Sequence, residues 1–333
     1  MERIDILIAT YNGEKYLKEQ LESILNQTYK NIRIVIVDDK STDSTTSIIH
    51  EYMKKDDRIV FFENEINIGS NKTFEYLLTK VESDYFMFSD QDDYWKKDKV
   101  ELSYNKLIND NADLVFTDLE VVDENLNLIN KSFNILKKYD YKIKRCSGYD
   151  MLNIYNVITG CTILSKSCYI KDILPFPDSK NILHDYWVGL VVSLKGKTTY
   201  LDVPTIKYRQ HLNNQVGTSR YTDRLKSFNE IREHLINLRI ENFNVFLDNK
   251  EIFNKAQNEF NRQALEYYNM VKLKRNINFK NLSVFHKLYK HDRVIFYISL
   301  FMIMNLPFVV RWLYNVKKTL KNTFNKNHIK DVN

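Results

Sequence analysis

Three aspartates, Asp90, Asp92 and Asp93, follow a short apolar run at residues 84–88. Such a run, rich in aromatic residues, is typical of a buried strand. Because side chains alternate in an extended chain, Asp90 and Asp92 are predicted to point the same way and Asp93 the opposite way. Two adjacent carboxylates repel each other unless a cation neutralises them, and their oxygens suit Mg²⁺ or Mn²⁺. The alternative is an acidic turn that only ends the strand.

Polar residues also follow three earlier strands, which are predicted at residues 3–9, 32–37 and 59–62. Helical spacing separates these strands, so the alternation predicts an α/β fold with a Rossmann-like, mostly parallel sheet and helices on both faces. Ligands of such sheets bind beyond the carboxyl ends of the strands. Four polar clusters are therefore expected on one rim: residues 10–12, 38–39, 67–69 and 90–93.

Two phosphate-binding motifs are missing from the sequence. No G-x-G-x-x-G follows the first strand, and no P-loop pattern occurs. This absence disfavours a dinucleotide-dependent oxidoreductase and an ATPase. The chain has only 7 glycines to hold phosphate, so a metal ion is expected to carry the phosphate charge.

The 333 residues divide into two regions of opposite charge. Residues 221–333 contain 20 Lys and Arg against 10 Asp and Glu, which leaves 29 against 33 for residues 1–220. We expect a catalytic domain over residues 1–220 and a basic, helical extension over residues 221–333. The extension suits an anionic membrane surface. Nothing N-terminal resembles a nucleic-acid module. The three cysteines are expected to be reduced thiols, as in a cytoplasmic protein. The start of the chain is expected to be a strand and not a signal peptide.

The extension contains two kinds of helical segment. Residues 221–290 show amphipathic spacing, with Leu235 and Leu238 on the apolar stripe. Residues 294–310 carry no charge and lie between Arg293 and Arg311. They are short for a spanning helix and suit a helix lying in the bilayer interface. A buried core helix and a homodimer interface are the alternatives.

Four motifs together resemble those of family 2 glycosyltransferases with the GT-A fold. They occupy residues 10–12, 37–43, 67–69 and 89–95, in matching order and spacing over roughly the first 210 residues. The resemblance implies a nucleotide-sugar half over residues 1–110 and an acceptor half over residues 111–220. The sequence S-D-Q-D-D-Y-W most resembles bacterial rhamnosyltransferase-like members that use dTDP-rhamnose.

The resemblance assigns donor-side roles residue by residue. Asp39 would bind the base, Asp90 would lie near the ribose and the metal, and Asp92 would be the main metal ligand. For Asp38 and Asp43, the roles of turn and cap residue are as well supported as a role in ligand binding. Members commonly have Lys-Asn-Phe where this chain has Lys-Thr-Phe. The remaining expected donor contacts are Thr10, Tyr11 and Asn12 in the nucleotide pocket and Lys72 near the diphosphate.

The resemblance also assigns roles on the acceptor side. Asp185 follows His184 at the start of an apolar helical run, where an aspartate is usually a cap. It matches the family's catalytic base, and the helix dipole is expected to keep it ionised. His184 orients the base or fills space. In the segment Y-R-Q-H-x-x-N-x-V-G, His211 would be a metal ligand or a diphosphate donor, and Arg209 a second phosphate contact.

The implied activity is inverting, metal-dependent transfer of a sugar from a nucleotide-diphosphate donor. The acceptor would be a glycan or lipid-linked glycan in cell-surface polysaccharide synthesis, with the protein peripheral on the inner face of the cell membrane. The alternatives are a sugar-1-phosphate nucleotidyltransferase and a non-catalytic sugar-nucleotide-binding scaffold subunit.

Overall fold

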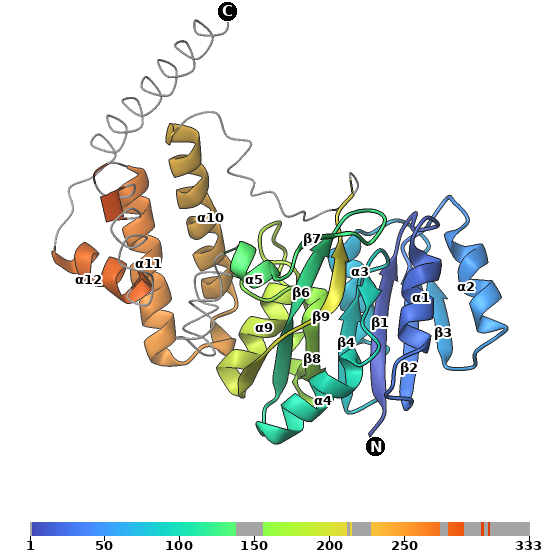
Figure 1. The fold of residues 1–333 in the computed structure, drawn as a ribbon. Helices are drawn as coiled ribbons and strands as arrows, with labels where there is room; N and C mark the ends of the chain where they lie inside the picture. Colours follow the sequence, from blue (N-terminus) through green and yellow to red (C-terminus); the bar gives the residue numbers. More distant parts are fainter. Residues whose placement is uncertain are drawn as a thin grey trace, which may run out of the picture. The chain divides into compact units, whose positions relative to one another are not determined.

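The computed structural model describes residues 2–137, 156–211, 214, 228–273, 279–289, 301–302 and 306. The chain divides into two compact units, Met1–Gly217 and Thr218–Asn333. The first unit combines a sheet with helices, whereas the described part of the second unit is helical (Figure 1).

The first half of the α/β unit alternates strands and helices, as its sequence predicts. The strands are β1 (Ile4–Thr10), β2 (Ile32–Asp38), β3 (Ile59–Glu63) and β4 (Tyr85–Ser89), which pair in parallel in the order β3-β2-β1-β4. The connecting helices are α1 (Leu17–Leu25), α2 (Thr45–Met53) and α3 (Ser70–Leu78). The carboxyl ends of these parallel strands therefore meet on one rim.

The second half extends the sheet to nine strands in all. It adds β5 (Tyr94–Trp95), β6 (Leu114–Val122), β7 (Leu128–Asn130), β8 (Ile163–Lys166) and β9 (Thr198–Arg209). Strands β5, β7 and β8 run against the other six, so the sheet is mixed but mostly parallel. Strands β6 and β7 pair in an antiparallel hairpin. The helices are α4 (Lys99–Asn109), α5 (Phe133–Leu136), α8 (Ile170–Ile173) and α9 (His184–Lys195), with 3₁₀ turns at Gly160–Thr162 and Ser167–Tyr169.

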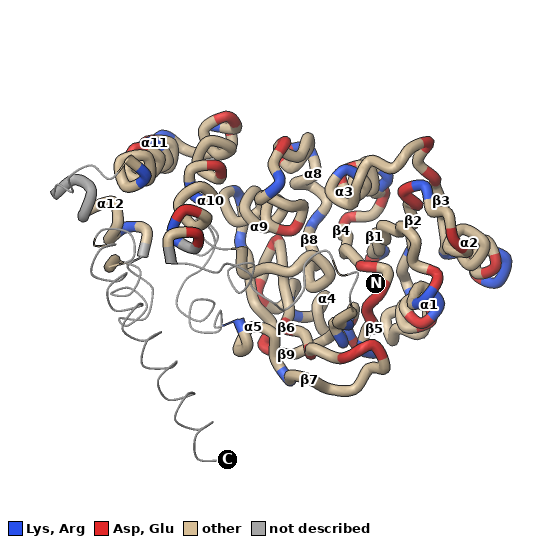
Figure 2. Tube along the Cα trace, turned by 90° about the horizontal axis from the view of Figure 1, so that it is seen from above, with Lys and Arg blue, Asp and Glu red and all other residues tan. Residues whose placement is uncertain are grey.

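Helices cover both faces of the sheet, and alternating strand residues supply the two cores. Ile4, Ile6 and Ile8 of β1 pack with α1 and α4 residues on one face. On the other face Phe88 of β4 meets Phe74 of α3, with ring centroids 5.1 Å apart. Viewed from above, α3 and α9 lie on one side of the sheet and α1 and α4 on the other (Figure 2). The amino-terminal residues of α3 and α9 lie at the carboxyl ends of the strands and line the cavity described below.

The described part of the second unit contains three main helices, α10 (Phe228–Asp248), α11 (Lys255–Lys272) and α12 (Phe279–Tyr289), with a 3₁₀ turn at Lys250–Ile252. Aromatic rings join the helices: Phe243 and Tyr268 stack with centroids 6.0 Å apart, and Tyr267 and Phe285 lie 6.2 Å apart. No helix in the described part of the chain has the length and apolar character needed to cross a bilayer. Nearly all of residues 294–310 lies outside the described residues.

The apolar face of α10 differs from the predicted stripe by one position. Leu235 and Leu238 are only half-buried, whereas Ile236 is buried. Two arginines share the buried face, and Arg232 Nη2 donates a hydrogen bond to the carbonyl oxygen of Val271, 2.8 Å away. Arginine stems can cover apolar surface while their charged ends are paired. Hydrophobicity alone therefore misplaces the face, which comprises Arg232, Ile236, Arg239, Phe243 and Phe246.

Candidate active site

A cavity of about 900 Å³ opens at the carboxyl ends of β1, β2 and β4. This is the rim at which the sequence predicts ligand binding. Residues of both halves of the α/β unit line the cavity. Eight of the ten predicted site residues are among them, namely Thr10, Tyr11, Asn12, Asp39, Asp90, Asp92, Asp185 and His211.

Asp93 does not face away from Asp90, so that expectation is wrong. Asp93 is fully buried, and ligand atoms of Asp90, Asp93 and Cys161 lie within 4.8 Å of one another. The physical reason is that β4 ends at Ser89 and the chain bends over the next residues, so strand alternation no longer applies. The Asp93 side chain therefore lies buried beneath the rim.

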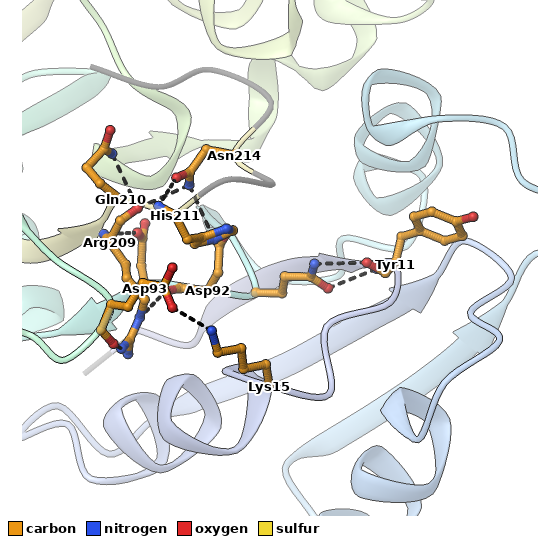
Figure 3. Close-up of polar contacts among 10 residues, drawn as sticks. Tyr11, Lys15, Asp92, Asp93, Arg209, Gln210, His211 and Asn214 are labelled. Atoms are coloured by element: carbon orange, nitrogen blue, oxygen red, sulfur yellow. Dashed lines mark hydrogen bonds and ion pairs between the residues drawn. The ribbon is translucent and has the colours of Figure 1, made fainter. Parts of the chain in front are cut away.

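Asp92 instead meets His211, which comes from the other end of the α/β unit. Asp92 Oδ2 lies 2.8 Å from His211 Nε2. Figure 3 shows Asp92 and Asp93 beside the segment that carries Arg209, His211 and Asn214. A carboxylate and an imidazole brought together in a cavity are a suitable pair of ligands for a divalent transition-metal ion.

The electrostatics of the acidic residues fit a bound cation. Burial, followed by the negative charges of Asp92 and Asp185, raises the pKa of Asp90 to about 7. Burial, followed by the charges of Asp92 and Asp90, also raises the pKa of Asp93 well above its usual range. A nearby divalent ion reverses such shifts, because it stabilises the ionised carboxylates. The residues present therefore fit a hard divalent metal ion.

A lysine lies beneath residues 90–93, the acidic loop between β4 and β5. Lys99 is fully buried, and its Nζ atom lies 4.5 Å from the centroid of the Trp95 ring. Burial lowers the pKa of Lys99 to about 7, although Cys161 and Asp93 oppose this shift. Its Nζ makes no hydrogen bond to any described residue. Lys99 therefore gives the loop only a partial positive charge at neutral pH.

On the predicted nucleotide side, Asp38 holds the turn rather than facing the cavity. Its Oδ1 accepts a hydrogen bond from Thr10 Oγ1 at 2.8 Å, and its Oδ2 accepts one from the Ser41 amide at 2.7 Å. The Asn12 side chain accepts the Thr42 amide at 2.8 Å, with Asn12 itself at a φ of 48°. These bonds fix the chain after β1 to the chain after β2.

Asp39 joins the second strand end to the third predicted motif. Its Oδ1 accepts the amide of Ile68 and its Oδ2 the amide of Gly69, each at 2.8 Å. Gly69 has a φ of 83°, a conformation that glycine adopts without strain, and α3 begins at the next residue. Residues 67–69 therefore form a tight turn that holds the Asp39 carboxylate at the edge of the cavity.

Gln91 connects the acidic loop with Tyr11, a link that the sequence motifs do not predict. The Tyr11 amide donates to Gln91 Oε1 at 2.9 Å, and Gln91 Nε2 donates to the Tyr11 carbonyl oxygen at 3.0 Å. A Cβ atom at Gly13 would lie 2.2 Å from Gln91 Oε1. A larger residue at position 13 would therefore displace the Gln91 side chain from this position. The place of Gly13, two residues after Tyr11, is the only sequence signal of the contact.

Asp185 is the second residue of α9 and lines the cavity. Its Oδ1 accepts hydrogen bonds from the Tyr186 amide at 2.6 Å and from Asn156 Nδ2 at 3.1 Å. Burial raises the pKa of Asp185 to about 6, and these two bonds oppose that shift. Burial therefore outweighs the effect expected from the helix terminus. Asn156 lies 29 residues before Asp185, and no sequence pattern connects the two.

His184 packs against aromatic residues. Its ring stacks on Phe74 with centroids 4.1 Å apart and meets the edge of Phe88 at 5.2 Å. Burial lowers the pKa of His184 to about 3, so the imidazole is neutral at physiological pH. A Cβ atom at Gly160 would lie 2.5 Å from its Nε2. His184 therefore fills the space between α3 and the turn at Gly160, next to Asp185.

The remaining two predicted site residues do not line the cavity. The Nζ atom of Lys72 lies 2.7 Å from Glu75 Oε2, and its side chain is 49% exposed. Arg209 is only 2% exposed, and its guanidinium group pairs with Glu19. The Arg209 side chain is buried under the acidic loop and does not line the cavity. This position differs from the phosphate contact expected for it.

The sequence comparisons agree on one family. The model for Glycosyl transferase family 2 matches residues 5–172. The dTDP-rhamnosyl transferase RfbG of Shigella flexneri is 32% identical over 226 residues, which cover 64% of this chain and 74% of that protein. The putative teichuronic acid biosynthesis glycosyltransferase TuaG of Bacillus subtilis is 26% identical over 231 residues, which cover 69% of this chain and 87% of that protein.

The fold is similar to that of solved structures at low sequence identity. The crystal structure of residues 1–349 of S. aureus TarS matches with a TM-score of 0.55 and 15% identity, over 87% of this chain and 80% of that chain. The same fragment in complex with UDP-GlcNAc matches with a TM-score of 0.54. The architecture of the α/β unit is therefore one found in solved structures.

Proposed function

The chain belongs to glycosyl transferase family 2, and we propose that it transfers rhamnose from dTDP-rhamnose to a hydroxyl group of a glycan or lipid-linked glycan. Membership makes it an inverting, nucleotide-sugar-dependent glycosyltransferase of the GT-A type. The similarity to the Shigella flexneri dTDP-rhamnosyl transferase supports the choice of sugar. The similarity to the Bacillus subtilis protein supports a role in cell-surface polysaccharide synthesis.

One observation carries the proposal: the acidic loop, His211 and Asp185 line the same cavity. Two groups of residues in this lining have different chemistry. Asp90, Asp92 and His211 supply the oxygen and nitrogen atoms that a metal ion requires. Asp185 supplies a carboxylate with a pKa of about 6, which suits a base at neutral pH.

The nucleotide is proposed to bind beside β1 and β2. Thr10, Tyr11, Asn12 and Asp39 line the cavity, and the Asp39 carboxylate is proposed to contact the base. The Gln91 bonds to the Tyr11 backbone would hold this wall next to the diphosphate. Lys72 stays a predicted diphosphate contact.

The metal ion is proposed to be Mg²⁺ or Mn²⁺, held by Asp90, Asp92 and His211. When bound, it would neutralise the negative charge that develops on the leaving diphosphate. The ligand atoms of this chain support this choice because carboxylate oxygens suit hard cations and imidazole is also accepted by Mn²⁺.

The reaction step follows from the position of Asp185. The carboxylate of Asp185 accepts the proton of the acceptor hydroxyl group. The hydroxyl oxygen forms a bond to the anomeric carbon while the bond from that carbon to the diphosphate oxygen breaks. Because attack comes from the face opposite the diphosphate, the anomeric configuration inverts. The nucleoside diphosphate leaves with the electron pair of the broken bond.

A donor panel tests this proposal. Purified protein is incubated with Mn²⁺, an acceptor glycan extract and each of dTDP-rhamnose, UDP-GlcNAc, UDP-glucose and GDP-mannose. We expect dTDP-rhamnose to give the highest kcat/KM, with dTDP and a rhamnosylated product formed in equal amounts. Mass spectrometry of the product and chromatography of the nucleotide measure both.

The other outcomes separate the alternatives. A higher kcat/KM with another donor would refute dTDP-rhamnose as the donor but would agree with glycosyltransferase activity. Release of pyrophosphate would indicate a sugar-1-phosphate nucleotidyltransferase. Donor binding without turnover on any acceptor would indicate the non-catalytic scaffold subunit.

We also propose that the basic C-terminal region holds the enzyme at an anionic membrane surface on the cytoplasmic side. The excess of 20 Lys and Arg over 10 Asp and Glu in residues 221–333 supports this placement. We expect the full chain to co-sediment with vesicles that contain phosphatidylglycerol, and the bound fraction to fall as salt rises. Equal binding to neutral phosphatidylcholine vesicles, or none to either, would contradict it and favour a core helix or a homodimer interface.

A further inference from the structure

Arg209, the last residue of β9, is one of the largest fully buried side chains of the described chain. An arginine side chain stays charged in a protein and needs partners when it is buried. Its Nε donates to the carbonyl oxygen of Asp92 at 2.9 Å, and its Nη1 donates to the carbonyl oxygen of Glu124. Its guanidinium group lies 4.5 Å from the centroid of the Tyr16 ring. These partners fix the guanidinium group on the inner side of the acidic loop.

The backbone of Arg209 also contacts residues next to the proposed metal ligands. The Arg209 amide donates to Asp93 Oδ1 at 3.2 Å, and its carbonyl oxygen accepts Asn214 Nδ2 at 3.1 Å. The Asn214 side chain in turn accepts the amide of His211. Figure 3 shows these side chains converging on Asp92 and His211. Arg209 thus contacts the backbone of one proposed ligand and, through Asn214, that of the other.

Glu19 of α1 completes the arrangement from the protein surface. Its Oε2 lies 2.5 Å from Arg209 Nη2, and its side chain is 53% exposed, against 2% for Arg209. Glu19 supplies the countercharge that a buried guanidinium group requires. Nothing in the sequence motifs singles out this glutamate, because it lies on the polar face of an ordinary amphipathic helix.

We infer that Glu19 and Arg209 form a positioning pair for the metal ligands Asp92 and His211, and that Arg209 does not contact the donor phosphates. This inference rests on the proposed function, because it concerns the metal site of that reaction. Partners that orient metal ligands typically change metal affinity about 10- to 100-fold when they are removed. Neither residue of the pair would touch the substrate.

Three variants test the positioning pair: Glu19→Ala, Arg209→Lys and, as a control, Glu51→Ala. Like Glu19, Glu51 is a helical glutamate with a cationic partner, but its partner, Lys55, is exposed. Neither Glu51 nor Lys55 lines the cavity. Mn²⁺ binding is measured by electron paramagnetic resonance with dTDP present, and kcat and the donor KM are measured over a range of Mn²⁺ concentrations. Thermal unfolding shows whether each variant is folded.

We expect Arg209→Lys to weaken Mn²⁺ binding by about 10- to 100-fold, because lysine keeps the charge but loses the fork of hydrogen-bond donors. Glu19→Ala should weaken it in the same direction by a smaller factor, and Glu51→Ala should not change it. At saturating Mn²⁺ the kcat of Glu19→Ala should return towards that of the unmodified protein, with the donor KM unchanged.

A phosphate contact predicts the opposite result. Glu19→Ala would then free the guanidinium group and tighten dTDP binding, and Arg209→Lys would keep much of the binding because lysine also binds phosphate. Either result overturns the inference. Unchanged Mn²⁺ binding by Glu19→Ala overturns only the positioning pair. If the unmodified protein itself does not bind Mn²⁺, the proposed metal site falls, and the pair with it.

Discussion

Replacing Asp185 by Asn is expected to lower kcat by about 10² to 10⁴-fold, the usual contribution of a general base. Asn has nearly the same shape as Asp, so α9 and the contact with Asn156 should remain. It cannot accept the proton of the acceptor hydroxyl group, however. Calorimetry should show donor binding close to that of the unmodified protein, because Asp185 is not proposed to touch the nucleotide.

The pH dependence provides a second measurement of the same role. The base acts in its ionised form, and burial raises the pKa of Asp185 to about 6. As pH falls through this value, the carboxylate takes up a proton and kcat should fall about tenfold per pH unit. Above pH of about 7 the carboxylate is ionised, and kcat should be constant. The profile should be recorded at saturating Mn²⁺, so that loss of metal does not contribute.

Asp178 provides the control for this substitution. It is exposed, precedes α9 and does not line the cavity, so Asp178→Asn should leave kcat unchanged. Full turnover by Asp185→Asn, or a kcat that does not change between pH 5 and pH 7, would refute the assignment of the base.

Replacing Asp92 by Ala is expected to abolish measurable transfer. The metal ion contributes several kcal/mol of charge stabilisation in reactions of this type, which corresponds to about three orders of magnitude in rate. Asp92 is the carboxylate whose Oδ2 lies 2.8 Å from His211 Nε2. Unlike Asp185→Asn, this variant should also lose metal-dependent nucleotide binding, which calorimetry with dTDP measures with and without Mn²⁺.

Asp98 is the matched control for Asp92. It lies six residues further along the chain, is exposed and precedes α4 without a side-chain capping bond. Asp98→Asn should keep both turnover and Mn²⁺-dependent dTDP binding. If Asp92→Ala retains both as well, Asp92 is not a metal ligand, and the proposed role of the acidic loop is wrong.

Sequence patterns predict the framework of the α/β unit well. The alternation of apolar strands and amphipathic helices, and the polar clusters at strand ends, are local signals that depend on periodicity and turn chemistry. They place Thr10, Asp39 and Asp92 on one rim, where the cavity lies. Asp92 and His211 are far apart in the sequence, so only the family resemblance could predict that they lie close together in the structure.

The errors have a common physical origin, because each concerns side-chain direction outside regular structure or long-range pairing. Asp93 turns inwards because the chain bends once β4 has ended. Arg209 turns under the loop because Glu19, on a distant helix, supplies its countercharge. The buried face of α10 includes Arg232, whose partner is a carbonyl oxygen on α11. Neither periodicity nor residue type reports such partners.

The two hydrogen bonds between the Gln91 amide and the Tyr11 backbone have a consequence for the energetics of donor association. They couple the wall proposed to bind the nucleotide to the loop proposed to lie beside the diphosphate. Ordering flexible segments during association costs free energy that is then lost from affinity. In this protein the two hydrogen bonds already hold these segments together in the folded chain. A donor that contacts both segments would therefore lose less free energy to ordering them.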